Sequence, residues 1–93
     1  MRKFVFKKSY GMSYRKQGYI FFCCQNYAKL SPRMQKKVLR ICDSVAGELS
    51  KALFEAMTSE TVPELIAAKH FISTKKMYQL IQEFFKNWDF LKN

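Results

Sequence analysis

The sequence has 93 residues, of which 48% are hydrophobic and 16% aromatic, and its formal net charge is +10. A chain of this length and apolar content predicts one globular domain and excludes an intrinsically disordered protein. The longest apolar run, residues 19–24, is too short to span a bilayer, and no signal-peptide core follows the basic N-terminus. The three cysteines fit no disulfide framework, so we expect reduced thiols and a cytoplasmic protein without a membrane segment.

The positive charge is concentrated in one half of the chain. Residues 1–42 contain eleven Lys and Arg and no acidic residue, whereas residues 43–93 contain six Lys and Arg against seven Asp and Glu. An asymmetry of this size favours an anionic partner, with nucleic acid as the first candidate.

Residues 1–18 alternate aromatic and basic side chains, and we expect them to form an extended basic arm. The aromatic rings either pack over the core or stack on single-stranded bases. An alternative is a hairpin that pairs residues 3–7 with residues 19–23, which would make the fold α+β. The arm and the following helices carry the residues that we expect to contact phosphates: Arg2, Lys3, Lys7, Lys8, Arg15, Lys16, Arg33, Lys36, Lys37 and Arg40.

Helical periodicity covers most of the remaining chain. Residues 19–30 are ambiguous between strand and helix, and the spacing of their apolar residues favours a helix. Ser31 and Pro32 then predict a helix start, and Gly47 predicts the end of that helix. The apolar residues that recur at helical spacing in this second helix are Met34, Val38, Ile41 and Val45.

Three further helices are expected in the C-terminal half. An apolar stripe predicts a helix over residues 48–58. Thr61 and Glu64 fit a capping box that starts the next helix, which ends at His70, where a structural capping role is expected. Ser73 caps the last helix, whose inward residues are Met77, Leu80, Ile81, Phe84, Phe85 and Trp88. We therefore predict an all-α fold, in which residues 19–93 form a single compact bundle of four to five short helices.

Residues 64–80, ELIAAKHFISTKKMYQL, resemble the helix-turn-helix of small DNA-binding regulators. The resemblance spans residues 61–85 and predicts a helix-turn-helix unit over residues 61–86, and the wording of residues 69–85 is also similar to small helix-turn-helix proteins of mobile genetic elements. Phe71 stands where the family usually has a turn glycine, so either the turn is of a longer type or Phe71 packs into the core. The positions that match the motif are Ile66, Ala67, Ile72, Ser73, Met77 and Leu80.

This resemblance implies a non-enzymatic protein that binds duplex DNA, as a transcriptional regulator or as an accessory factor of a mobile element. The second helix of the motif would lie in the major groove, with its N-terminal residues at the base edges. Lysines in its first turn are unfavourable near the positive end of the helix dipole, and a bound anion would neutralise them. The DNA-contacting positions that follow are Ser73, Thr74, Lys75, Lys76, Tyr78, Gln79 and Gln82.

Two other classes of function stay open. The helical unit could bind an acidic protein partner, for instance as an inhibitor, or the arm could bind RNA or single-stranded DNA. A homodimer is expected from the apolar C-terminal helix, through Phe84, Phe85, Trp88, Phe90 and Leu91. We expect no cofactor, and no zinc site, because the spacing of Cys23, Cys24, Cys42 and His70 fits no zinc motif. No catalytic constellation is recognisable.

Overall fold

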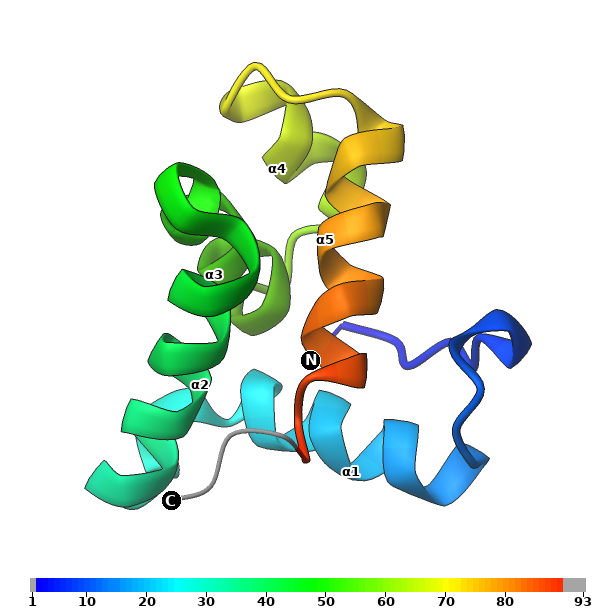
Figure 1. Ribbon diagram of the computed structural model, residues 1–93, viewed down its shortest axis with the longest axis vertical. Coiled ribbons are helices and arrows are strands. Elements are labelled where there is room, and N and C mark those ends of the chain that lie inside the picture. The colour runs from blue at the N-terminus through cyan, green and yellow to red at the C-terminus, as the bar shows by residue number, and fades with distance from the viewer. Residues whose placement is uncertain (1, 90–93) are drawn as a thin grey trace.

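The computed structural model of the protein describes residues 2–89 and folds them into helices joined by short turns (Figure 1). No strand occurs in this range, so the alternative of an N-terminal hairpin in an α+β fold is wrong. Three 3₁₀ turns, η1 (Lys8–Tyr10), η2 (Tyr27–Lys29) and η3 (Gly47–Leu49), separate the longer elements. The α-helices are α1 (Tyr14–Gln25), α2 (Pro32–Ala46), α3 (Ser50–Thr58), α4 (Pro63–Lys69) and α5 (Thr74–Lys86).

Serine caps begin three of these helices. The hydroxyl oxygens of Ser31 and Ser73 accept the backbone N–H groups of Met34 and Lys76, which confirms both predicted caps. Ser13 caps α1 in the same way, so this helix begins within the segment that was expected to be extended. The helix predicted over residues 19–30 is thereby confirmed as far as Gln25, where η2 takes over.

The predicted start of α4 is wrong by one residue. The capping position belongs to Val62, which has φ −65° and ψ 149°, and no side chain caps the helix. The residue before a proline is disfavoured in helical conformation, so Pro63 fixes the first helical position. Thr61 therefore lies outside the helix, and its N–H donates to the Ser59 hydroxyl at 2.9 Å.

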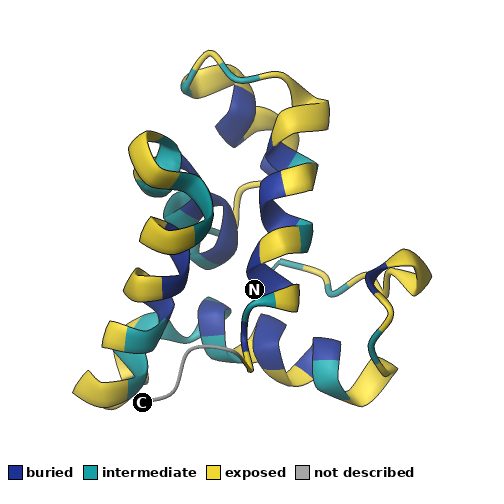
Figure 2. Ribbon diagram, viewed as in Figure 1, coloured by how far each residue is buried: buried dark blue, intermediate teal, exposed yellow. Residues whose placement is uncertain are grey.

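The core lies between α2, α3 and α5, with α1 across one end (Figure 1). α2 and α5 run in opposite directions, so the start of α2 lies beside the end of α5. The buried residues form one face of each helix, as Figure 2 shows. Periodicity predicted the inward face of α5 correctly, because all six of its expected core residues are buried: Met77, Leu80, Ile81, Phe84, Phe85 and Trp88.

The N-terminal arm is folded onto this bundle. The Phe4 ring packs against Tyr14 and Phe21, with ring centroids 5.5 and 5.4 Å away, and Tyr10 packs on Phe85 at 5.1 Å. The side-chain amide of Gln17, which is fully buried, holds the backbone of Lys7. Phe4 and Tyr10 therefore pack over the bundle as a strap, which was one of the two alternatives, whereas Phe6 and Tyr14 are 40% and 66% exposed.

Candidate functional site

The unit that the sequence singled out consists of α4, the four residues 70–73 and α5, and its two helices pack on each other. The chain leaves α4 through backbone hydrogen bonds, with the Ile72 N–H donating to the Ala67 carbonyl at 2.9 Å. Phe71 has φ 58°, the left-handed conformation that glycine adopts at low cost, and its side chain is 97% exposed. The alternative in which Phe71 packs into the core is therefore wrong. Phe71 itself adopts the conformation that the turn glycine usually supplies.

The first turn of α5 is exposed and basic. It contains no acidic residue, and neither Lys75 nor Lys76 forms an ion pair within residues 2–89. Of the predicted DNA-contacting residues, Tyr78 and Gln82 are half-buried. The remaining five are exposed: Ser73, Thr74, Lys75, Lys76 and Gln79. Helical periodicity therefore predicted correctly which side of α5 faces the solvent.

A carboxylate neutralises the end of α4 beside this turn. One oxygen of Glu55 on α3 accepts from Lys69 Nζ at 2.7 Å, and the other lies 2.9 Å from His70 Nε2. The hydrogen bond from Lys69, and then the contact with His70, lower the pKa of Glu55. His70 therefore has a structural role, because it joins the end of α4 to α3.

The basic residues of α2 lie far from the first turn of α5. Lys37 Nζ sits over the Trp88 ring at 4.4 Å, and Lys16 Nζ binds the Asp89 carboxylate at 2.7 Å. These contacts place the first half of α2 and the start of α1 at the C-terminal end of α5, opposite its first turn (Figure 1). The predicted phosphate-contacting residues on α2 therefore do not form one surface with the predicted DNA-contacting residues of α5. The α2 residues concerned are Arg33, Lys36, Lys37 and Arg40.

The basic residues of the arm are spread over several surroundings. Arg2 Nη1 donates to the carbonyls of Ala56 and Thr61 at 2.6 and 3.2 Å, so this guanidinium is partly used within the fold. Lys7 Nζ lies over the Tyr78 ring of α5 at 5.6 Å. The other predicted phosphate-contacting residues of this segment, Lys3, Lys8 and Arg15, are exposed.

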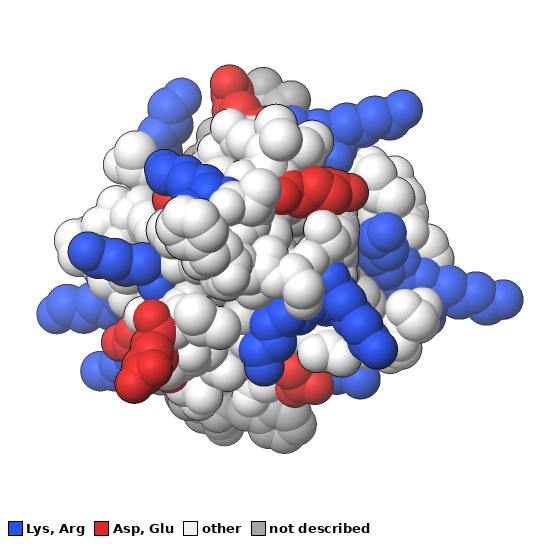
Figure 3. Space-filling model, turned by 90° about the horizontal axis from the view of Figure 1, so that it is seen from above, with Lys and Arg blue, Asp and Glu red and all other residues white. Residues whose placement is uncertain are grey.

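Figure 3 views the molecule from the end that carries the turn between α4 and α5. Lys and Arg side chains project from most sides of this end, and carboxylates lie between them. On this face the positive charge is therefore interrupted by carboxylates and does not form one continuous patch.

The aromatic residues expected to form a dimer interface are buried in the chain's own core. Phe84, Phe85 and Trp88 are 0%, 5% and 3% exposed, which leaves them no free surface. Phe90 and Leu91 lie outside the described residues. No described part of the chain therefore presents the predicted dimer surface.

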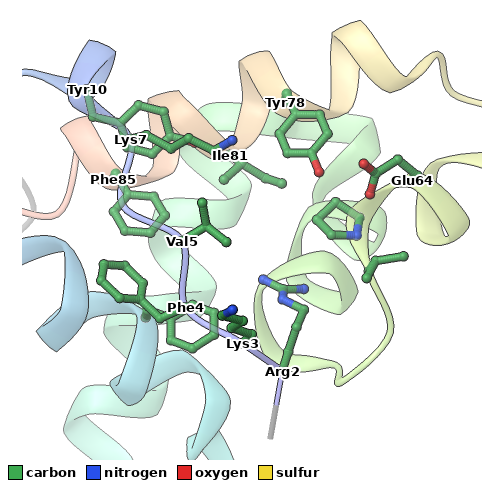
Figure 4. A pocket seen from close by; sticks show the side chains of 13 residues that line it. Arg2, Lys3, Phe4, Val5, Lys7, Tyr10, Glu64, Tyr78, Ile81 and Phe85 are labelled. Carbon is green, nitrogen blue, oxygen red and sulfur yellow. The ribbon is translucent and has the colours of Figure 1, made fainter.

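Sequence reasoning missed a cavity between the arm and the pair formed by α4 and α5. Its volume is about 310 Å³, and its walls come from the arm, α1, the start of α4 and α5. No local sequence pattern predicts it, because residues far apart along the chain form its walls. Among its polar lining residues, Arg2 and Tyr78 face each other (Figure 4).

The described cysteines form neither a disulfide nor a metal site. Cys23, Cys24 and Cys42 are free thiols, and residues 2–89 hold no cluster of metal-ligating side chains. No helix in the same range is both long and apolar enough to cross a bilayer.

No protein-family model matches the chain, and neither a curated protein nor a solved structure matches it significantly.

Proposed function

We propose that the protein binds duplex DNA through the exposed face of α5. The observation that carries this proposal is the first turn of α5, which exposes Lys75 and Lys76 without a compensating carboxylate. Lysines in this position are unfavourable near the positive end of a helix dipole. A phosphate or a guanine edge would supply the missing negative charge, and the helix stability lost in the free protein would be regained in the complex.

The chemistry of the remaining face suits base recognition. Gln79 is exposed and Gln82 is half-buried on the same side of α5 as Lys75. A glutamine amide can pair with adenine N6 and N7, and a lysine can donate to guanine O6 and N7. In a helix-turn-helix, residues at these positions of the second helix contact base edges in the major groove. The protein would then act as a transcriptional regulator or as an accessory factor of a mobile element.

The distribution of charge limits the affinity of a single chain. The first half of α2, which carries its basic residues, lies toward the C-terminal end of α5, away from the first turn and the phosphates that would flank it. Lys7 over Tyr78 and the exposed Lys3 are the arm residues available on the α5 side. A protein with few phosphate contacts binds DNA weakly, so we expect micromolar affinity at physiological salt.

Fluorescence anisotropy with random duplex DNA, single-stranded DNA and structured RNA tests this function. We expect the duplex to bind most tightly, and we expect Lys75→Glu combined with Gln79→Ala to abolish that binding. Lys51→Glu reverses the charge of an exposed lysine on α3 and is the matched control, with an expected loss of less than about threefold. Absence of duplex binding at low salt, or equal losses in the two variants, would contradict the proposal.

A protein-interaction module is the second candidate, and it is favoured by Phe71. A ring that is 97% exposed at the tip of a turn, on a residue held in left-handed conformation, suits contact with another protein.

RNA binding through the arm is the third candidate function, and replacement of Lys7, Lys8, Arg15 and Lys16 tests it. Phe4 and Tyr10 of the arm are already packed within the fold, which leaves Phe6 and Tyr14 as its exposed rings, so we expect that set to affect duplex binding less than the α5 variant does.

A further inference from the structure

The cavity beneath the arm has a mostly apolar wall, to which five aromatic residues contribute (Figure 4). Phe4 and Val5 close it on the arm side, and Ile81 and Phe85 of α5 lie opposite. Its volume of about 310 Å³ is at the small end of the range of about 300–1,000 Å³ typical of small-molecule sites. The space is therefore suited to one small ligand with an apolar body.

Arg2 lines this cavity, and one edge of its guanidinium has no partner among the described residues. Its Nη1 is held by the carbonyls of Ala56 and Thr61, whereas its Nε and Nη2 donate to no residue within 2–89. Burial is the main cause that lowers the pKa of Arg2, and no carboxylate of the described residues forms an ion pair with it. A guanidinium edge with two free N–H groups is the geometry that binds a carboxylate through two parallel hydrogen bonds.

The other charged groups of the wall leave the cavity positive. Lys3 and Lys7 line it together with Arg2, and Glu64 is the one carboxylate among its lining residues. Figure 4 shows the Glu64 carboxylate turned toward the Tyr78 hydroxyl. Burial, and then Glu64, raise the pKa of Tyr78, and the same carboxylate acts on Arg2, where it opposes the effect of burial on the pKa.

We propose that this cavity binds a small aromatic carboxylate, with its carboxylate on the free edge of the Arg2 guanidinium and its ring among the aromatic side chains of the wall. The ring would meet Phe4, Phe21 and Phe85, whose edges and faces suit a planar aromatic body. The ligand would join the arm to α4 and α5, since it would touch all three. This inference does not depend on DNA binding by α5.

Isothermal titration calorimetry of the full chain with 2-naphthoate, and with 2-naphthamide as the neutral isostere, tests the proposal. We expect saturable binding of one 2-naphthoate per chain and binding at least about tenfold weaker for the amide. Arg2→Gln should weaken 2-naphthoate binding by a similar factor. Lys8→Gln is the matched control, because Lys8 is a basic arm residue outside the cavity wall, and it should leave the affinity unchanged.

A second variant keeps the test decisive if Arg2→Gln loosens the arm. Val62 lines the cavity, is 45% exposed and precedes α4 in an extended conformation, so Val62→Trp should fill the space without disturbing a helix. It should abolish binding and preserve the melting temperature of the free protein. Equal binding of acid and amide, tighter binding of decanoate than of 2-naphthoate, or full binding by Val62→Trp would overturn the proposal.

Discussion

Gln17 on α1 holds both backbone polar groups of Lys7 in the arm. The Lys7 N–H donates to Gln17 Oε1 at 3.0 Å, and Gln17 Nε2 donates to the Lys7 carbonyl at 2.8 Å. A third hydrogen bond, 3.1 Å long, joins Gln17 Nε2 to the Met12 carbonyl. A fully buried amide with three partners in the arm makes the arm part of the folded domain.

Gln17→Leu should therefore loosen the arm. The substitution leaves the Lys7 N–H without a partner and leaves the Lys7 carbonyl with the Tyr10 N–H alone, and we expect the free energy of unfolding to fall by about 2–3 kcal/mol. Urea denaturation measures this change, and proteolysis near Lys7 should become faster. Gln79→Leu, at an exposed position of α5, is the control and should change stability by less than about 0.5 kcal/mol. Equal effects of the two variants would show that the arm does not depend on Gln17.

Phe71→Gly should stabilise the protein. The side chain is 97% exposed, so its loss removes no buried surface, and glycine relieves the cost of φ 58°. The free energy recovered by relieving this backbone strain exceeds the cost of the conformational entropy that glycine adds to the unfolded chain. We expect a net increase of about 0.5–1 kcal/mol in the free energy of unfolding. Phe71→Ala keeps a Cβ in the same conformation and should leave stability nearly unchanged. A destabilised Phe71→Gly would mean that the ring makes contacts within the fold.

Glu55 should make the stability of the protein depend on pH. Lys69 and His70 lower its pKa in the folded state, so its contribution is present above the pKa of the unfolded chain. This contribution is lost as the pH falls through the lowered value. Glu55→Gln should reduce the unfolding free energy at pH 7 by about 0.5–1 kcal/mol, because the carboxylate is partly exposed to solvent. Urea curves should show the difference from wild type at pH 7 and none near pH 2.

The thiols should differ in reactivity. Burial raises the pKa of Cys42 to about 12 and raises that of the buried Cys24 as well, whereas Cys23 is half-exposed. The thiolate is the reactive form, so we expect 5,5′-dithiobis(2-nitrobenzoate) at pH 8 to modify Cys23 first. Mass spectrometry should find one modified cysteine under native conditions and three after unfolding. Modification of Cys24 or Cys42 as fast as Cys23 would contradict the packing around α1 and α2.

The helices with strong local signals were predictable from the sequence. Ser31 and Ser73 have cap positions followed by clear apolar periodicity, and both helices begin there. α1 was harder, because one of its buried positions is Gln17, whose partners Lys7 and Met12 lie before the helix. A buried polar residue disrupts the periodic pattern, and its hydrogen bonds exist only in the tertiary structure.

The candidate site was predictable in part. Periodicity along α5 is enough to place Lys75 and Gln79 on its outer surface, and the structure agrees. The separation of this face from Arg40 and the rest of the α2 residues follows from the antiparallel packing of two helices, which no local pattern encodes. The cavity at Arg2 could not be predicted from the sequence either, because its walls come from segments that only the tertiary structure brings together.

The central proposal, contact between the first turn of α5 and duplex DNA, is tested most directly by the salt dependence of binding. We would measure log Kd against log salt by anisotropy for the wild type, for Lys75→Ala with Lys76→Ala, and for Lys29→Ala with Lys51→Ala. Removal of two phosphate contacts should reduce the magnitude of the slope by about 1.8 in the α5 variant and leave it unchanged in the control. An unchanged slope in the α5 variant, or an equal reduction in both, would contradict the proposal that α5 meets the DNA.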